Sequence, residues 1–545
     1  MKVAIWFLVG VWVGSGDSAA LDMADAQHLA AGRAIYHEGR LPSGRPLTAT
    51  RGEGSRLVGA AAACVQCHQR SGMGLAEGAN VIPPITGPAL FGARLPDGYA
   101  PRRAPGMDFR DYPFRTRAPY NESTLAQAIR NGHSNDGRRF SILMPRYTLD
   151  DAAMKALAVY LRSLSPQRSP GVDERVVHFA TVITPRVEPG DREAMIGVLN
   201  ACFAEHALDQ TKGPSGNAES GDRQFWKLHV WTLVGPPQSW HRQLADYHAR
   251  QPVFAMISGL GGEAWSPVEA FCERAELPCL FPNVQPAADA GAGRYSFYFS
   301  RGLWLEAAVF ARQLAARDST LLRSGRVVQL VGRSDRAQRA AEMLTRALAD
   351  SGVPVETWRL DNDQDRLSGL AANDALVLWL TPTELAGLMQ RVPLPPRTES
   401  VLVSGILSGM QAAPLNPAWR KVAVLAYGFD APARWDQRMQ RYLRPWLKKY
   451  GLARADERLQ GNTLAACNLL SEGMLRLRGN YLRDYLVEWV ENYPETMGLA
   501  SAPQAYPRFS LGPGQRFSSK GIYMVRFADA DGQRIEPLQD ALIVP

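Results

Sequence analysis

Apolar, strand-like runs alternate with amphipathic helical stretches from about residue 176 to residue 450, and this alternation restricts the fold more than any other feature. Continuous apolar strands separated by helices are typical of parallel sheets covered on both faces. There are too many strand–helix units for one small sheet, and 545 residues are enough for roughly two to four domains. The predicted strands are Val176–Thr184, Leu228–Val234, Val253–Ser258, Pro278–Phe281, Arg326–Val331, Ala375–Leu380, Val401–Ser404 and Val422–Tyr427. The predicted helices are Arg192–His206, Trp240–Arg250, Pro267–Arg274, Leu303–Ala316, Ala337–Ser351, Thr383–Arg391 and Ala433–Tyr450.

The strongest chemical signal lies ahead of this region, in the pentapeptide Cys64-Val65-Gln66-Cys67-His68. Two cysteines three positions apart can form thioethers to both vinyl groups of a haem, and the adjacent histidine is then held at the iron. A thioredoxin-like pair would need a βαβ setting, and a zinc site would need two further ligands at matching spacing; neither is present nearby. The motif therefore predicts one covalent haem c, and a single CxxCH excludes dihaem peroxidase chemistry.

Residues 21–164 resemble a class I cytochrome c. Four features occur in that family's order: a first helix over 25–39, the CxxCH motif, the segment Gly87–Gly92, and a Met-Pro step followed by a helix over 150–164. The resemblance implies an all-α domain in which Gly32 permits a close crossing of the first and last helices.

The same resemblance assigns roles around the haem. Cys64 and Cys67 would hold it, His68 would be the proximal ligand, and the carbonyl of Pro88 would accept the other ring N–H of His68. Met144 would supply the sixth ligand, since a thioether followed by proline and a helix matches the family's distal loop.

Met73, Met107 and His133 are rival sixth ligands, and a methionine in the core is the alternative fate of Met144. His/Met ligation favours reduced iron and raises the potential, which suits an electron carrier. Because both axial positions would be filled, the sequence predicts no catalysis at the haem and no enzyme.

Basic residues are concentrated in the region Leu21–Pro170, which contains 19 of them, 18 being arginine, against 12 acidic residues. Several fall in the 75 residues between His68 and Met144, an insertion relative to small cytochromes. We expect this insertion either to dock an acidic redox protein, such as a periplasmic dehydrogenase or oxidase, or to form a solvated loop. A nucleic-acid partner does not suit an exported chain. The insertion's arginines include Arg102, Arg103, Arg110, Arg115 and Arg117.

The N-terminus reads as a secretory signal peptide, because Lys2 is followed by the apolar run Val3–Val13 and by small residues up to Ala20. An apolar run of 11 residues is shorter than the ~20 that a spanning helix needs, although an uncleaved anchor is the alternative. We expect a periplasmic protein without a membrane span after cleavage. The predicted organisation is a signal peptide at 1–20, a cytochrome domain at 21–164, a Pro/Gly/Ser linker at 165–173 and a two-lobed module at 174–545.

The order of strands and helices after the linker resembles the type I periplasmic binding proteins, especially those for branched-chain amino acids and amides. The chain's end also fits, with a helix over Thr463–Gly479 and strands over Gly521–Phe527 and Ala541–Pro545. The resemblance implies two doubly wound α/β lobes that close on a small ligand. One lobe would hold 175–295 with the return around 430–500, and the other 296–429 with the C-terminal strands.

Ligands of open parallel sheets bind beyond the carboxyl ends of strands, so the candidates come from those loops. The glycine-rich turn at 258–265 offers one hydroxyl and an acid, Glu263, where an anion would sit. We therefore assume neither an amino-acid ligand nor that the cleft is used, and each candidate has an ordinary loop or core residue as its alternative. The candidates are Ser258, Gly259, Asn283, Tyr298, Ser404 and Tyr427.

Four cysteines lie in this second module. Cys272 and Cys279 are close in sequence, on a helix end and the next strand, so we predict a local disulfide in an oxidising compartment. Cys202 and Cys467 fall on helices of one proposed lobe, and pairing and two buried thiols both remain open.

The sequence thus predicts a periplasmic one-haem electron carrier fused to a solute-binding-protein-like module that binds a small ligand or docks a redox partner. The alternative is the solute-binding component of an ABC importer that carries an accessory haem domain. No Ser/His/Asp arrangement, paired carboxylates or phosphate-binding glycines support an enzyme.

Overall fold

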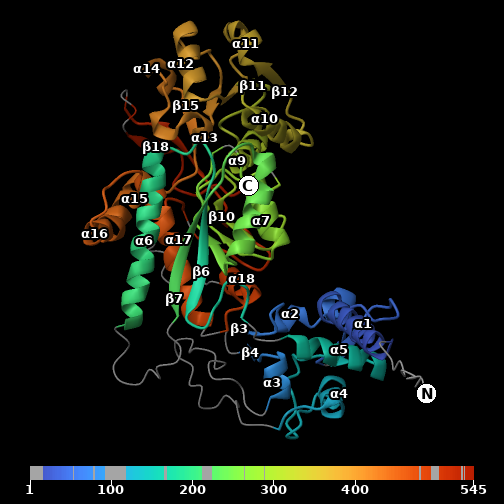
Figure 1. Cartoon of the computed structure of the whole chain (residues 1–545). Coiled ribbons are helices and arrows are strands. Elements are labelled where there is room, and N and C mark those ends of the chain that lie inside the picture. The colour runs from blue at the N-terminus through green and yellow to red at the C-terminus, as the bar shows by residue number, and fades with distance from the viewer. Residues whose placement is uncertain are drawn as a thin grey trace, which may run out of the picture. The chain divides into compact units, whose positions relative to one another are not determined.

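A computed structural model describes the whole chain except residues 1–15, 53, 78–79, 93–117, 165–167, 212–223, 263, 288, 478–479, 493–502, 508, 530–531 and 533. The chain divides into two compact units (Figure 1). Unit 1 contains residues 1–168 and Arg476–Glu488, and unit 2 contains residues 169–475 and 489–545. Within the described residues, no helix combines the length and the apolar character needed to cross a membrane. The predicted signal peptide falls mostly outside the described residues, and the first helix begins at Gly16.

Unit 1 is built on helices, but it is not all-α as predicted. A three-stranded antiparallel sheet has the order β2-β1-β5, and β3 and β4 form a hairpin. Glycines with positive φ, Gly52 and Gly54, turn β1 back onto β2, and this hairpin signal went unused in the prediction. The helices are α1 (Gly16–Glu38), α2 (Val65–His68), α3 (Gly87–Phe91), α4 (Glu122–Asn131) and α5 (Asp151–Ser163). The strands are β1 (Thr48–Arg51), β2 (Ser55–Val58), β3 (Leu75–Glu77), β4 (Asn80–Ile82) and β5 (Arg146–Tyr147).

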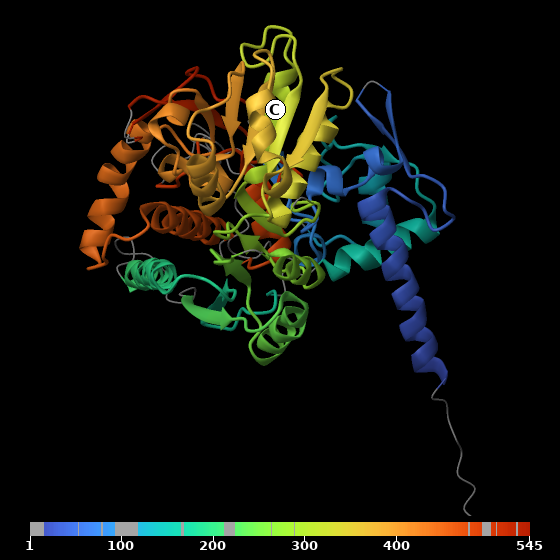
Figure 2. The same ribbon diagram turned by 90° about the horizontal axis from the view of Figure 1, so that it is seen from above.

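The first and last helices of this unit cross closely at Gly32, as predicted. Figure 2 shows α1 as one long helix, and α1 packs against α5. A Cβ added at Gly32 would lie 2.1 Å from the Ala156 carbonyl oxygen and 2.6 Å from the Tyr160 Cβ, so only glycine fits. Asp150 caps α5 by accepting a hydrogen bond from the Ala153 N–H at 2.8 Å. The unit's core surrounds this crossing and includes Ile35 and other fully buried side chains.

Unit 2 contains two sheets whose strands are mostly parallel. The first has the order β16-β10-β9-β8-β6-β7, and the second β12-β11-β13-β14-β15-β17-β18, in which β17 and β18 run antiparallel to their neighbours. The strands of the first sheet are β6 (Val176–Ile183), β7 (Phe225–Thr232), β8 (Ala255–Ile257), β9 (Cys279–Leu280), β10 (Ser296–Ser300) and β16 (Phe517–Ser519). Those of the second are β11 (Val327–Val331), β12 (Val355–Arg359), β13 (Ala375–Trp379), β14 (Ser400–Val403), β15 (Ala423–Tyr427), β17 (Tyr523–Phe527) and β18 (Ile535–Pro537).

Helices separate the parallel strands of both sheets, as the sequence pattern predicts (Figure 1). The longer helices are α6 (Pro189–Thr211), α7 (Trp240–Arg250), α8 (Ser266–Arg274), α9 (Leu303–Ala315), α10 (Asp335–Leu348), α12 (Pro382–Arg391) and α17 (Glu457–Leu477), whereas most of α18 (Arg483–Glu491) is grouped with unit 1. The shorter helices are α11 (Leu360–Asp363), α13 (Gly405–Ser408), α14 (Pro417–Arg420), α15 (Pro432–Arg438) and α16 (Arg444–Lys449). A π-helical turn over 439–443 separates α15 from α16, where one helix was predicted.

Four strands of unit 2 were not predicted, and one predicted strand is wrong. The strands β10, β12, β16 and β18 were missed, and β10 belongs to the first sheet, not to the other lobe as predicted. No strand forms at 541–545, where one was predicted. The strand Ile535–Pro537 pairs with β17 instead. The tail at 541–545 makes a single bridge, between Ile543 and Ile522.

The first five strands of the two sheets follow the same spatial order, second-first-third-fourth-fifth in chain order. In such doubly wound sheets the order reverses between the first and third strands, and the loops there diverge to leave a crevice. This reversal falls between β6 and β8 in the first sheet and between β11 and β13 in the second. The topology therefore indicates where a ligand would be sought.

A disulfide joins Cys202 on α6 to Cys467 on α17, which resolves the alternatives that the sequence left open. The predicted bridge between Cys272 and Cys279 is wrong, because both are buried free thiols. The sulfur of Cys272 contacts the Met256 sulfur at 3.5 Å, so it sits in an apolar core instead of a bridge.

Replacing Cys202 and Cys467 together with alanine is expected to lower the free energy of unfolding of unit 2 by about 2–4 kcal/mol. The bridge spans 265 positions, so its loss frees a large loop in the unfolded chain. Urea unfolding followed by tryptophan fluorescence measures the change. A reductant should destabilise the wild type to the same extent and leave the double variant unaffected; a wild type insensitive to the reductant would contradict the bridge.

Candidate functional site

The CxxCH motif of unit 1 folds into one helical turn, α2, which is preceded by Cys64 and ends after His68. The His68 N–H donates to the Cys64 carbonyl at 2.9 Å, and Gln69 closes the turn with a positive φ of 61°. Cys64 and Cys67 are both of intermediate burial. Burial raises the pKa of the Cys64 thiol to about 12, and the Tyr147 hydroxyl is hydrogen-bonded to it. Neither thiol is engaged in a bridge.

The His68 ring is buried, with 6% of its surface exposed, and is oriented through one nitrogen. Its Nδ1 lies 3.0 Å from the Pro83 carbonyl, and burial lowers the pKa of His68 to about 4. The prediction that the Pro88 carbonyl accepts the hydrogen bond from His68 is wrong. The Pro88 carbonyl instead accepts the Gly92 N–H at 3.0 Å, at the end of α3. The geometry leaves Nε2 of His68 as the nitrogen available to a metal.

Met144 is half-buried and packs against the same core as Cys64. The guanidinium of Arg146 donates to the Met144 carbonyl and so fixes the backbone that carries the thioether. Cys64 and Met144 pack against one apolar core, and Cys67 and His68 follow Cys64 in the same helical turn. This set of donors fits a covalently attached haem.

The alternative sixth ligands differ in their burial and surroundings. Met73 is buried and packs with Leu482 and Tyr485, whereas His133 is exposed. Met107 lies outside the described residues, as do the insertion arginines Arg102, Arg103, Arg110, Arg115 and Arg117. The docking role of that insertion stays a prediction.

The loop after His68 is held by residues that follow it by more than 400 positions. Glu488 is buried and accepts hydrogen bonds from the Ser71 N–H at 2.8 Å and the Ser71 hydroxyl at 2.5 Å. Arg70 pairs with Asp484 at 3.2 Å. Both acids lie in the range predicted for the second module. The structure instead groups them, within Arg476–Glu488, with unit 1.

In unit 2, three of the predicted ligand residues meet at the carboxyl ends of β8 and β9. The Ser258 hydroxyl accepts from the Asn283 Nδ2 at 3.0 Å, and the Asn283 N–H donates to the Gly259 carbonyl at 2.6 Å. Thr463 of α17, which the sequence analysis missed, joins them at 3.1 Å from the Ser258 hydroxyl. The Oδ1 of Asn283 is buried and has no hydrogen-bond partner among the described residues.

Gly259 serves packing as well as backbone hydrogen bonding. A Cβ at this position would lie 2.2 Å from the Trp265 ring. The absence of a side chain therefore lets Trp265 cover the turn, a reason for glycine that needs no ligand.

Tyr298 lies apart from these residues. It belongs to the hydrophobic core that packs against the first sheet of unit 2. It is buried, with 1% exposed, and its ring stacks on Phe517 at a centroid distance of 5.5 Å. Burial, with Glu269 nearby, raises the pKa of Tyr298. It is a core residue here and does not join the predicted ligand residues.

Ser404 is also buried, and its hydroxyl is already used in hydrogen bonds within the fold. It caps α13 through the Leu407 N–H at 3.2 Å and donates to a Glu306 carboxylate oxygen at 2.5 Å. The Ile406 N–H donates to the other oxygen of Glu306 at 2.9 Å. Burial raises the pKa of Glu306 to about 8.

This raised pKa predicts a pH-dependent stability that Glu306→Gln removes. The folded state keeps a proton that the unfolded chain releases above pH ~4.5, so stability falls by about 1.4 kcal/mol per pH unit until the folded pKa near 8 is passed. Thermal or urea unfolding between pH 5 and 8 measures this slope. Glu306→Gln should flatten it, whereas Glu342→Gln, at an exposed position of α10, should not; equal slopes in all three proteins would refute the assignment.

Tyr427, the last predicted residue, leads to a pocket that the sequence analysis did not find. Its buried hydroxyl lies 3.4 Å from Nη2 of Arg458, which is on the first turn of α17. A cavity of about 570 Å³ lies there, lined by Trp435 of α15 and by residues 454–458. Asp456 caps α17 through the N–H groups of Arg458 and Leu459, a start signal that would have placed the helix six residues earlier than predicted.

Over about two thirds of its length, the chain is similar to solved solute-binding proteins of bacteria. An extracellular ligand-binding receptor from Verminephrobacter eiseniae is 13% identical, with 66% of this chain and 99% of that chain covered and a TM-score of 0.48. A possible leucine/isoleucine/valine-binding protein from Rhodopirellula baltica is 14% identical, with 68% and 98% covered and a TM-score of 0.47. A branched-chain amino acid ABC transporter protein from Thermus thermophilus, with bound valine, is 13% identical, with 69% and 98% covered and a TM-score of 0.46.

Neither a protein-family model nor a curated protein matches the chain. Nothing about a ligand of this chain follows from the structural likenesses.

Proposed function

We propose that this chain is an exported solute-binding protein that carries a haem domain. The observation that carries the proposal is the repeated strand order of unit 2, because ligands of such sheets bind at the carboxyl ends of the strands where the order reverses. Polar groups occupy such an end: Ser258, Asn283 and Thr463 are bonded together, and the Asn283 Oδ1 has no partner among the described residues. The simplest use of this module is to deliver its bound solute to an importer.

The test is calorimetric titration of the full-length protein with amino acids, amides, organic acids and sugars. We expect saturable binding of one chemical class, and a weaker affinity in Asn283→Ala. Asn416→Ala, which removes the cap of α14, is the matched control and should bind as the wild type does. A panel that yields no saturable heat would overturn solute capture.

We propose further that unit 1 is a c-type cytochrome domain. Cys64 and Cys67 would hold the haem by thioethers, with His68 and Met144 as axial ligands. The group would supply one-electron transfer when bound. In this function the protein acts in the periplasm, and an acidic redox protein is the expected electron partner. The orientation of His68 through Pro83 and the shared core beneath Cys64 and Met144 support this part of the proposal.

Met144→Ala is expected to abolish the weak red absorption band of sulfur-ligated ferric haem and to lower the midpoint potential, because a thioether favours reduced iron. Visible spectra and redox titration of the purified protein measure both changes. Met73→Ala, which removes a buried methionine of the same unit, is the control and should keep the band. A Met144→Ala protein that retains both properties would assign the sixth position to another residue.

A further inference from the structure

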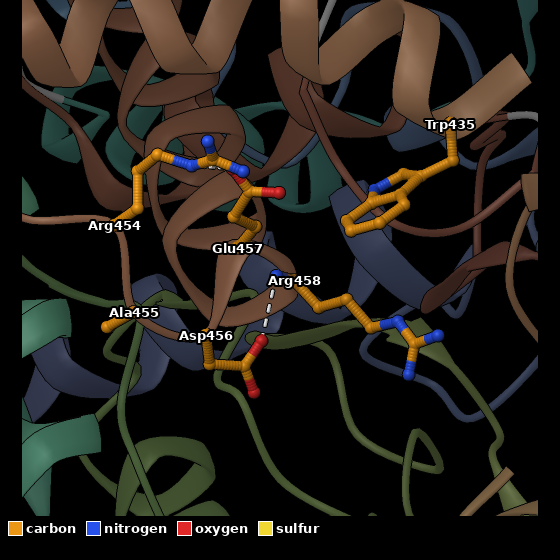
Figure 3. A pocket seen from close by; sticks show the side chains of 6 residues that line it. All are labelled: Trp435, Arg454, Ala455, Asp456, Glu457 and Arg458. Carbon is orange, nitrogen blue, oxygen red and sulfur yellow. Dashed lines mark hydrogen bonds and ion pairs between the residues drawn. The ribbon is translucent and has the colours of Figure 1, made fainter. Parts of the chain in front are cut away.

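The pocket at the start of α17 contains a cation, Arg458, that forms no ion pair within the described part of the chain. Four of its six lining residues are charged, Arg454, Asp456, Glu457 and Arg458 (Figure 3). Glu457 is already paired twice, with Arg444 at 2.8 Å and with Arg454 at 2.8 Å, and these bonds lower its pKa. Figure 3 shows Arg454 and Glu457 turned toward each other, while Arg458 extends away from them toward Trp435.

Asp456 is likewise occupied, although it lies next to Arg458 in sequence. Its carboxylate accepts the backbone N–H groups of Arg458 at 2.8 Å and Leu459 at 3.1 Å, as the cap of α17. It forms no ion pair with the Arg458 guanidinium. The four charged lining residues sum to zero, and Arg458 is the one of the two lining arginines that forms no ion pair among the described residues.

The Arg458 guanidinium is half-buried and bonded to neutral acceptors alone among the described residues. Its Nη2 donates to Gln411 Oε1 at 2.9 Å and to the Tyr427 hydroxyl at 3.4 Å. Nε and Nη1 have no acceptor in the described part of the chain. A partly desolvated charge without a counter-ion is unfavourable, and an incoming carboxylate would relieve that cost.

Aromatic rings hold this guanidinium in place. It lies 4.4 Å from the Phe429 ring centroid and 5.7 Å from that of Trp435. Stacking on rings limits the orientations of the planar group, so its free N–H groups are already set for a bidentate acceptor. The Nε1 of Trp435 is buried without a partner among the described residues. Trp435 itself gives the pocket a flat apolar wall.

We infer that this pocket binds a small organic carboxylate with a flat apolar body, its carboxylate paired with Arg458 and its body against Trp435. The inference rests on the proposed solute capture and names its ligand class. A bidentate arginine–carboxylate pair in a partly desolvated site is worth about 1.5–3 kcal/mol, or roughly ten- to a hundredfold in affinity.

The test uses benzoate, benzamide and benzylammonium with the full-length protein in isothermal titration. Benzoate should bind at least about tenfold more tightly than its uncharged isostere benzamide, and benzylammonium should not bind. Arg458→Gln should weaken benzoate binding about tenfold or more, and Arg458→Lys should restore part of it, because the charge remains but the planar fork does not. Arg346→Gln, which removes an exposed cation of α10 that does not line the pocket, is the control and should bind benzoate as the wild type does.

Equal affinities for benzoate and benzamide would overturn the inference, whatever the folding of the variants. Absence of benzoate binding, with capture of an uncharged or cationic solute from the wider panel, would overturn the inference and leave solute capture standing. Absence of binding by every solute would overturn both.

Discussion

A protein in which Cys64 and Cys67 are both replaced by alanine is expected to contain no covalently bound haem. The two thiols are the attachment atoms that the CxxCH motif predicts, and the structure leaves both unbridged beside the buried His68 ring. Expression in a host that matures c-type cytochromes, followed by haem staining of a denaturing gel and intact-mass measurement, gives the result. The wild type should stain and be heavier than its processed polypeptide by one haem.

Two further sets of variants test whether the loss of haem is specific to Cys64 and Cys67. Single replacements should keep one thioether and stain weakly, because each cysteine supplies one bond. Replacement of Cys272 and Cys279, the free buried thiols of unit 2, should leave the haem content unchanged. A colourless wild type, or a stained double variant at positions 64 and 67, would end the haem proposal.

Local patterns predicted the elements that depend on local physics. The continuous apolar runs gave strands within a few residues of β6, β11 and β13, since a strand buried on both faces needs an unbroken apolar sequence. The resemblance to class I cytochromes c placed Gly32 at the helix crossing, and the structure confirms this because a Cβ there cannot be accommodated. Such features depend on residues that are near in sequence or on the size of one side chain.

Partners that are distant in sequence could not be predicted in the same way. The helix α17 brings Thr463 to Ser258 and Arg458 to Tyr427, and Glu488 reaches Ser71 across 417 positions. Nothing in the local pattern of these residues identifies their partners, because register and packing decide them.

Proximity in sequence was also misleading in two places. Cys272 and Cys279 are seven positions apart and stay thiols, whereas Cys202 and Cys467 are paired across 265 positions. The His68 acceptor was sought at Pro88 and is Pro83, because the Pro88 carbonyl is already used within its own helical turn. In both cases the missing information was the direction of a side chain or a carbonyl.

Arg516→Met is expected to lower the free energy of unfolding of unit 2 by about 3–5 kcal/mol, because it leaves a buried carboxylate unpaired. Arg516 Nη1 lies 2.8 Å from Glu491 Oε1, and the two side chains are 4% and 5% exposed. The same guanidinium donates through Nε to the Gly293 carbonyl at 3.1 Å and lies 4.8 Å from the Phe297 ring centroid. Urea unfolding of the full-length protein, followed by tryptophan fluorescence, measures the loss.

The double variant Arg516→Met/Glu491→Gln separates the unpaired charge from lost packing. Removing both charges should recover most of the stability, since replacing a whole buried ion pair is often nearly neutral. Arg346→Met, which breaks an exposed contact with Glu342 at 3.9 Å, is the control and should cost less than about 1 kcal/mol. A double variant as unstable as Arg516→Met would show that packing, and not the buried carboxylate, accounts for the loss.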